Sequence, residues 1–208
     1  GLTPIDEVKA AGASELEPYF ARKRPFVVRG LVNDWPLVQA GKRSGKAARG
    51  YLEGKAVDRP FVVTMGSDEF GGRIFYRDDM SMNTRTGKAR LPVIFERIDE
   101  VEQDETLPII YLGSVNIKNF FDGLHQDNHL KLGDRTPSES IWIGTKSRIA
   151  AHNDFPDNLA FVAAGRRRFT LFPPSQFKNL YIGPIDNTPA GRAISMVDFH
   201  NPDYDKYP

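Results

Sequence analysis

The chain has 208 residues, with 28 Lys and Arg against 27 Asp and Glu, a formal net charge of +1 and a hydrophobic fraction of 40%. This balance gives no electrostatic case for binding nucleic acid or a membrane surface, and the absence of cysteine excludes disulfides and thiolate chemistry. No apolar run has the length of a membrane span and the first residues form no signal peptide, so we expect a cytoplasmic protein of one domain.

The N-terminal part, residues 1–105, is expected to hold short helices and strands. Ser14, followed by Glu15, fits the N-cap of a short helix with acids in its first turn. Residues 25–30 form an apolar run that ends in glycine, which predicts a strand. Residues 44–53 predict a surface helix that carries basic side chains.

Two further apolar runs, residues 61–64 and 73–76, predict strands that are joined by a glycine-containing turn over residues 66–72. The polar stretch 77–90 predicts a loop, and a flap over a site is one interpretation of it. Residues 92–101 suit a helix with proline in its first turn.

Residues 109–113 predict a strand that carries Tyr111, for which a buried structural tyrosine is the simpler interpretation. The next stretch, residues 116–136, is irregular and places His125 and His129 at i, i+4 spacing. On a helix such a pair can chelate a metal. The surrounding glycine and polar residues favour exposed loop histidines instead.

A histidine and a carboxylate, His152 and Asp154, stand two residues apart in a region that reads as β-structure. On a strand, residues i and i+2 project to the same face, so the two side chains are expected to point together. They would supply two of the three ligands of a 2-His-1-carboxylate site, which holds Fe(II) and leaves other positions open. The alternative is a surface turn in which Asp154 bonds its own backbone.

Residues 158–172 predict a strand, a tight turn at Gly165 and a second strand that a proline pair ends. In the second strand Arg167 shares a face with Phe169 and Leu171. A cation at the head of an apolar face needs an anion, and guanidinium binds a carboxylate in bidentate fashion. The alternative is a basic hairpin whose arginines all reach solvent.

Several motifs occur in order along the second half of the chain. They are Ser-Ile-Trp-Ile-Gly at 140–144, His-Asn-Asp at 152–154, Gly-Arg-Arg-Arg-Phe-Thr-Leu-Phe-Pro-Pro at 165–174 and Val-Asp-Phe-His-Asn-Pro-Asp-Tyr at 197–204. This pattern resembles the cupin-like branch of the JmjC superfamily, and within it asparaginyl hydroxylases of the factor-inhibiting-HIF type. The resemblance is dense from about Tyr111 onward and thinner before it.

The resemblance implies a mainly β (α+β) fold, a double-stranded β-helix (cupin or jelly-roll) core with N-terminal helices. One cupin-like JmjC domain would cover residues 1–208. Residues 1–105 would be its helix and strand part, and residues 106–208 would be the first half of the β-helix, with the C-terminal strands missing. The implied activity uses Fe(II), O₂ and 2-oxoglutarate.

Five residues acquire roles by their position in the family pattern. His152 and Asp154 match the first two iron ligands. Arg167 matches the basic residue that binds the far carboxylate of 2-oxoglutarate, and Tyr111 matches a tyrosine whose hydroxyl joins that contact. Asn158 matches an asparagine that lies near the cosubstrate.

Two departures from the pattern concern the same site. Ile149 stands where the family has a threonine that also bonds the cosubstrate. The second histidine of the family triad lies in a later strand, and no such segment precedes Pro208. His200 falls in a stretch that is loop in the family, so we interpret it as a surface residue and expect the third ligand beyond Pro208.

The sequence thus predicts an Fe(II)- and 2-oxoglutarate-dependent hydroxylase that acts on an unknown protein side chain or small molecule. A non-catalytic cupin-fold binding module with a degenerate metal site is the alternative. A cupin isomerase or dioxygenase with another metal is a third interpretation, but it gives Arg167 no role. The substrate and the oligomeric state, including a homodimer, are left open.

Overall fold

The computed structural model describes residues 2–67, 71–102 and 108–208, and these group into two compact units. Unit 1 holds the chain up to Asp58 together with residues 116–141 and 161–166. Unit 2 holds residues 59–115, 142–160 and 167–208. The boundary expected at residue 105 lies outside the described residues, as does part of the turn expected at 66–72. The single domain expected over the whole chain stays a prediction.

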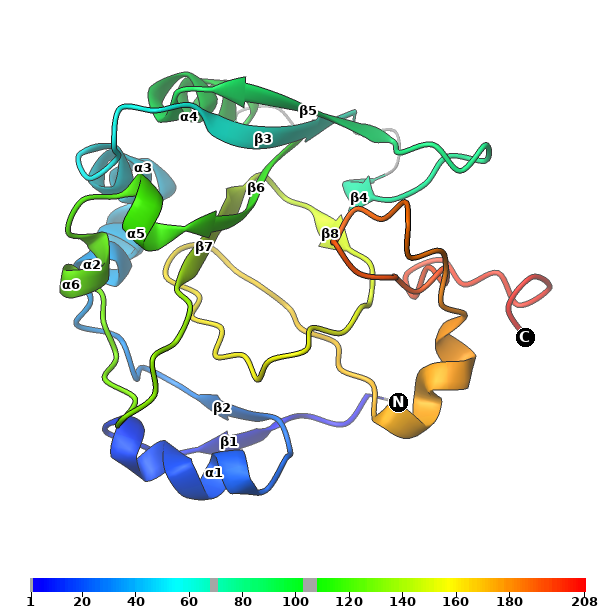
Figure 1. Cartoon of the computed structure of the whole chain (residues 1–208), viewed down its shortest axis with the longest axis horizontal. Coiled ribbons are helices and arrows are strands. Elements are labelled where there is room, and N and C mark those ends of the chain that lie inside the picture. Colours follow the sequence, from blue (N-terminus) through cyan, green and yellow to red (C-terminus); the bar gives the residue numbers. More distant parts are fainter. Residues whose placement is uncertain (1, 68–70, 103–107) are drawn as a thin grey trace. The chain divides into compact units, whose positions relative to one another are not determined.

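Unit 1 combines a short parallel strand pair with short helices (Figure 1). Strands β1 (Asp6–Val8) and β2 (Phe26–Val28) pair in register from Asp6↔Phe26 to Val8↔Val28. The other elements are η1 (Ala13–Leu16), α1 (Glu17–Ala21), α2 (Pro36–Arg43), α3 (Gly45–Glu53), α5 (Ile117–Phe120) and α6 (Leu124–Asp127). Its core includes Leu16, Leu37, Leu52, Phe121 and Leu124.

Two helix starts in unit 1 follow local chemistry. Ser44 caps α3, because its side chain accepts a hydrogen bond from the backbone amide of Ala47 at 2.9 Å. Pro36 opens α2, where a missing amide hydrogen costs nothing. The expectation for Ser14 is wrong. It lies inside η1, which Gly12 precedes, and the α-helical turn begins only at Glu17.

Unit 2 holds most of a four-stranded sheet in the order β5-β3-β6-β7. Strand β3 (Phe61–Gly66) pairs antiparallel with β5 (Thr84–Ala89) from Phe61↔Ala89 to Gly66↔Thr84, and with β6 (Ile109–Asn116) at Thr64↔Tyr111. Strand β7 (Ser140–Gly144) follows β6 in the sheet. A separate parallel pair joins β4 (Arg73–Ile74) to β8 (Arg148–Ile149).

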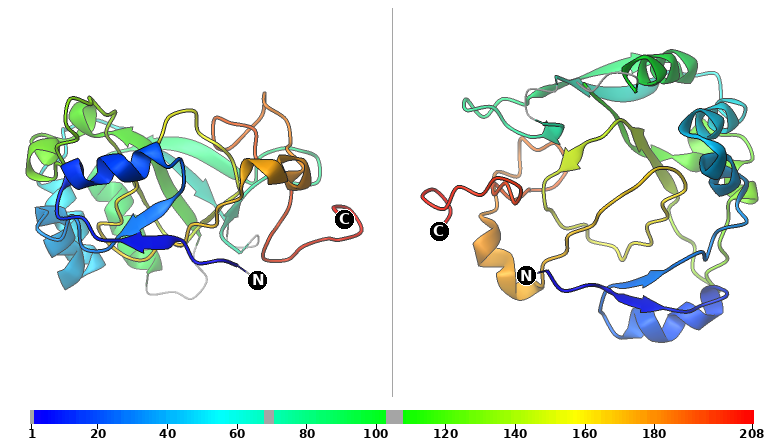
Figure 2. Two further views of the ribbon diagram at one scale, coloured as in Figure 1. Left: turned by 90° about the horizontal axis from the view of Figure 1, so that it is seen from below. Right: turned by 180° about the vertical axis from the view of Figure 1, so that it is seen from behind.

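Helix α4 (Leu91–Val101) lies beside β3 and β5 in both Figure 1 and Figure 2. It buries an apolar stripe at the spacing of one helix face, formed by Leu91, Ile94, Phe95, Ile98 and Val101. The sheet contributes Phe61, Val63, Ile109 and Leu112 to the buried set. A β-rich α+β domain with helices is therefore confirmed, and the double-stranded β-helix stays a prediction.

One strand expectation in unit 2 is wrong, and another holds in part. Residues 84–89, expected as loop, form β5. The strand is polar because it is an edge strand, and exposed charged residues such as Arg85 and Lys88 suit an edge that must not pair further. The strand expected at 73–76 is present as the shorter β4, whose partner is β8, far along the chain.

Residues 158–172 do not form the expected strand hairpin. The turn at Gly165 is present, with φ +75°, but no strand is assigned on either side of it. Phe169 and Leu171 are exposed, at 48% and 54%, and no strand of the described part pairs with this segment. Apolar residues at alternate positions do not form a strand by themselves, because a strand also needs a neighbouring strand for its backbone hydrogen bonds. Among the described helices, none is long and apolar enough to cross a membrane.

Candidate functional site

Tyr111 lies on β6 and is half-buried. The Arg167 guanidinium lies near enough for its charge to act on the Tyr111 phenol. Burial raises the pKa of the Tyr111 phenol above its ordinary value, and the neighbouring Arg167 cation partly offsets that rise. The structure therefore brings together two residues that are far apart in the sequence and that the family pattern assigns to one carboxylate.

Gly113 makes room for the Tyr111 ring. A Cβ atom at position 113 would lie 2.6 Å from Cε1 of Tyr111 and 3.3 Å from its hydroxyl oxygen. The two residues share one face of β6, so the ring lies along the strand over the glycine. Any other residue at position 113 displaces the ring.

Arg167 is exposed but has two neighbours in unit 2. Besides its contact with Tyr111, the guanidinium carbon lies 5.0 Å from the centre of the Phe169 ring, a cation–π distance. Which of the two interpretations given by the sequence applies to this exposed arginine stays a prediction.

Among the described residues, one ring nitrogen of His152 is engaged and the other has no hydrogen-bond partner. Nδ1 lies 2.8 Å from the carbonyl oxygen of Ala150. Because a carbonyl oxygen only accepts, Nδ1 carries the hydrogen, and in the neutral ring Nε2 keeps its lone pair. Backbone bonds of this kind orient the imidazole ligands of metal sites.

Asp154 is oriented by Asn158, whose Nδ2 donates to Asp154 Oδ2 at 3.1 Å. Both side chains are exposed. The other carboxylate oxygen, Oδ1, has no hydrogen bond within the part of the chain that the structure describes, so it is available to a ligand. Asn158 thus has a contact that the sequence did not predict, namely with the candidate metal ligand.

The convergence of His152 and Asp154 stays a prediction. Strand β8 ends at Ile149, so both residues follow it in chain without regular secondary structure, and the argument from strand alternation does not apply. Within the described residues, no group of three or more His, Asp and Glu side chains is placed to hold a metal. The free Nε2 and Oδ1 atoms fit two positions around Fe(II), which accepts imidazole and carboxylate donors.

The remaining histidines lie elsewhere. His200 has a side chain 67% exposed, with Nδ1 3.8 Å from Asp198 Oδ1, as expected for a surface residue. In unit 1, His129 Nδ1 lies 3.3 Å from Glu139 Oε1. His125 falls in the short helix α6, and its Nδ1 is buried without a hydrogen-bond partner among the described atoms.

Comparison with known proteins places the chain among cupin-like proteins. Residues 12–208 match the family described as the cupin-like domain. The chain belongs to this family. Of curated relatives, JmjC domain-containing protein D of Dictyostelium discoideum is 23% identical over 206 residues, which cover 91% of this chain and 43% of that protein. JmjC domain-containing protein F of the same organism is 35% identical over 83 residues, 34% of this chain and 18% of that protein.

A third relative of this cupin-like chain is the tRNA wybutosine-synthesizing protein 4 of Gibberella zeae, 23% identical over 210 residues. The match covers 96% of this chain and 19% of that protein. The chain thus spans less than half the length of the curated relatives it matches. Their names support the cupin-like JmjC superfamily, in which oxygenases occur.

Proposed function

We propose that this cupin-like chain is an Fe(II)- and 2-oxoglutarate-dependent hydroxylase that acts on a protein side chain or a small molecule. The observation that carries the proposal is the contact between Tyr111 and Arg167. A phenol hydroxyl and a guanidinium both donate hydrogen bonds, so neighbouring groups of these two kinds suit the binding of one carboxylate. The far carboxylate of a five-carbon dicarboxylate fits this pair.

In this proposal His152 and Asp154 are the two metal ligands of this chain. Nε2 of His152 and Oδ1 of Asp154 are the donor atoms, and Ala150 and Asn158 hold the two side chains in orientation. The metal and cosubstrate, when bound, supply the oxidising chemistry. The residues of the chain bind the metal and the cosubstrate and orient them. The proposed substrate is an asparaginyl side chain, as in the hydroxylases that the sequence resembles, or another side chain.

The test is anaerobic addition of Fe(II) and then 2-oxoglutarate, first to the 208-residue chain and then to the full product of its gene. Chelation of iron by the keto acid gives a visible metal-to-ligand absorption band. We expect the band, its loss in His152→Ala, and a weaker affinity for 2-oxoglutarate in Arg167→Ala and Tyr111→Phe. Arg168→Ala is the matched control, because this exposed neighbour has no place in the proposed site.

The rival function is a cupin-fold binding module without catalysis. Ile149 favours it, because a threonine contact to the cosubstrate is replaced by an apolar side chain. This reading requires that neither protein shows the absorption band at ample metal. Succinate formation from 2-oxoglutarate separates the hydroxylase from a cupin enzyme that uses another metal and no keto acid.

A further inference from the structure

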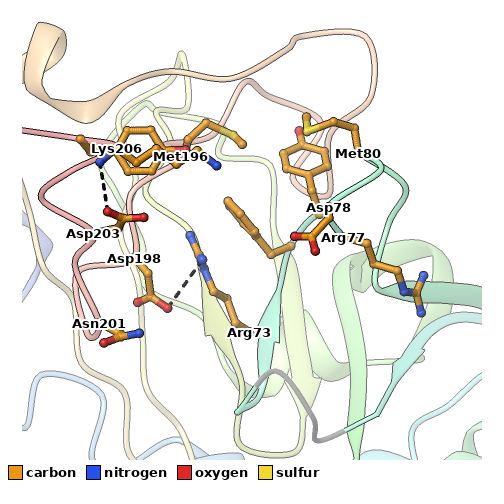
Figure 3. A pocket seen from close by; sticks show the side chains of 12 residues that line it. Arg73, Arg77, Asp78, Met80, Met196, Asp198, Asn201, Asp203 and Lys206 are labelled. Atoms are coloured by element: carbon orange, nitrogen blue, oxygen red, sulfur yellow. Dashed lines mark hydrogen bonds and ion pairs between the residues drawn. The ribbon is translucent and has the colours of Figure 1, made fainter.

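Unit 2 contains a cavity of about 440 Å³ between residues 73–80 and residues 196–207 (Figure 3). Its lining holds three cations and three carboxylates, namely Arg73, Arg77, Lys206, Asp78, Asp198 and Asp203, so its charge favours neither an anion nor a cation. Another feature of unit 2 has a defined charge and follows the proposed metal ligands directly in the chain. It is the contact between Phe155 and Arg192.

Phe155 comes directly after the proposed metal ligand Asp154 and is 80% exposed. A large aromatic ring that folding leaves in water is unfavourable, and exposed apolar groups of this kind are common at binding sites. The guanidinium carbon of Arg192 lies 3.6 Å from the centre of the Phe155 ring. At this distance the cation rests on the ring face. The structure thus places a positive charge next to the residue that follows Asp154.

The backbone that carries Arg192 is attached to the backbone that carries His152. The amide of Ser195 donates to the carbonyl oxygen of Ala151 at 2.7 Å, and Ser195 itself is fully buried. On the other side of Arg192, the hydroxyl of Thr188 donates to the carbonyl oxygen of Arg192. Because its backbone is fixed on both sides, Arg192 loses less conformational entropy when it binds a ligand.

Within the described ranges, the Arg192 guanidinium has no hydrogen bond or ion pair with another residue. The acids of the two segments, residues 150–160 and 185–195, are Asp154, Asp157 and Asp186, and none of them forms an ion pair with it. Asp154 accepts from Asn158 and is assigned to the metal in the proposed site. The charge on the ring therefore has no counter-charge from these segments.

The stacked arrangement suits one kind of ligand group. A guanidinium that lies on an aromatic face keeps its N–H donors in its own plane, where the ring does not obstruct them. Two parallel N–H groups then match the two oxygens of one carboxylate. The half-buried Arg192 can thus bind a carboxylate while it stays in contact with Phe155.

We propose that Arg192, stacked on Phe155, binds the carboxylate of an acidic side chain in a peptide substrate. This inference rests on the proposed hydroxylase function, because His152 and Asp154 define where the reacting residue of the substrate lies. Phe155 follows Asp154 directly, so the acidic residue lies within a few residues of the one that reacts. The substrate class is then an acidic peptide, and Arg192 determines this specificity.

The test is calorimetric titration of the full gene product, without 2-oxoglutarate, with blocked peptides acetyl-Ala-Xaa-Asn-Xaa-Ala-amide. Both Xaa residues are aspartate, asparagine or lysine. We expect the aspartate peptide to bind about three- to tenfold more tightly than the asparagine peptide of the same shape, and the lysine peptide to bind most weakly. Added salt should reduce this preference. Displacement of the aspartate peptide by glutarate would assign Arg192 to a free dicarboxylate and overturn the proposal.

Arg192→Met is expected to bind the aspartate and asparagine peptides equally. Arg192→Lys keeps the charge but not the paired donors, so it should retain only part of the preference. The matched control is Arg22→Met, because Arg22 belongs to unit 1 and also lies over a ring, 4.9 Å from the centre of Tyr19. The control should keep the full preference. A preference that survives Arg192→Met would overturn the proposal.

The absorption band of Fe(II) with 2-oxoglutarate is recorded on the same parent protein, so that the two proposals fail separately. If the band is absent while the aspartate peptide still binds through Arg192, the hydroxylase proposal fails and the carboxylate site stands. If the band is present and the parent binds the aspartate and asparagine peptides equally, only the inference about Arg192 fails.

Discussion

The ring of Tyr111 lies over Gly113 on strand β6, and this contact leaves no room for a side chain at position 113. A Cβ there would approach Cε1 of Tyr111 to 2.6 Å. The nearest atoms belong to a side chain and not to backbone, so an added methyl group moves the ring before it moves the strand. Gly113 is thus a positioning residue for the contact between Tyr111 and Arg167.

Gly113→Ala is expected to lower the pKa of Tyr111. Burial raises that pKa above 10.0 and Arg167 lowers it, with burial the larger cause. A displaced ring loses both influences, so the net change is a fall toward the ordinary value. Ultraviolet titration of tyrosinate formation measures this, and the Tyr111→Phe variant identifies which part of the titration belongs to Tyr111.

The matched control is Gly50→Ala in α3, where a Cβ meets nothing within 4 Å. It is expected to leave the tyrosine titration unchanged and to raise helix stability by about 0.5–1 kcal/mol. A Tyr111 pKa that is the same in Gly113→Ala and the parent protein would show that the ring does not depend on the glycine.

Gly144, a second glycine of the same sheet, differs from Gly113 because its nearest neighbours are backbone atoms and not a side chain. A Cβ at Gly144 would lie 2.4 Å from the carbonyl oxygen of Ile110 and 3.2 Å from Cα of Tyr111, which are backbone atoms of β6. Gly144→Ala therefore forces the two strands apart and is expected to cost about 2 kcal/mol or more in the free energy of unfolding. Urea denaturation measures it, and a loss below about 0.5 kcal/mol contradicts the close approach.

Local chemistry in the sequence predicted the elements that depend on few neighbours. The helix expected at 92–101 with proline in its first turn is α4, and the surface helix expected at 44–53 is α3. Strand β5 was missed because this edge strand is polar and has no alternation of apolar and polar residues in its sequence. The parallel partner of β4 was missed because its selection depends on residues far along the chain.

In the candidate site, too, some features could be predicted from the sequence and others could not. The spacing of His152 and Asp154 can be read from the sequence. Their orientation depends on hydrogen bonds to Ala150 and Asn158, which the alternation of residue types along the chain does not predict. The contact of Tyr111 with Arg167 followed from family resemblance, because composition gave no reason to pair them. Gly113 could have been found, since a glycine two residues from a tyrosine on one strand face leaves space for the ring.

Asp198 is expected to stabilise unit 2 through its two arginine partners. Burial alone would raise the pKa of its carboxyl group, but the backbone amide of His200 and the cations of Arg73 and Arg148 hold it below 3.8. Asp198→Asn leaves the largely buried Arg73 without its counter-charge and is expected to cost about 1–3 kcal/mol at neutral pH. Urea denaturation of the two proteins measures this loss.

The same pair of proteins gives a pH test with a defined sign. Because the folded-state pKa of Asp198 lies below its unfolded value, its contribution is complete above about pH 3.8 and is lost as the pH falls through the folded pKa. The stabilities of the parent and Asp198→Asn should therefore converge in acid and differ at neutral pH. Glu96→Gln, an exposed change on α4, should give no such convergence.

Ser44 offers the last prediction, which concerns the start of α3. Its side chain accepts the amide hydrogen of Ala47 at 2.9 Å, one of the donors that a helix start leaves without a partner. Ser44→Ala removes this acceptor and is expected to lower the free energy of unfolding by about 1 kcal/mol, whereas Ser44→Asp should retain most of the cap. Thermal or urea unfolding distinguishes the two. Equal losses in both variants would mean that the hydroxyl acts in some way other than as a cap, and Ser138→Ala, in an exposed loop, provides the baseline.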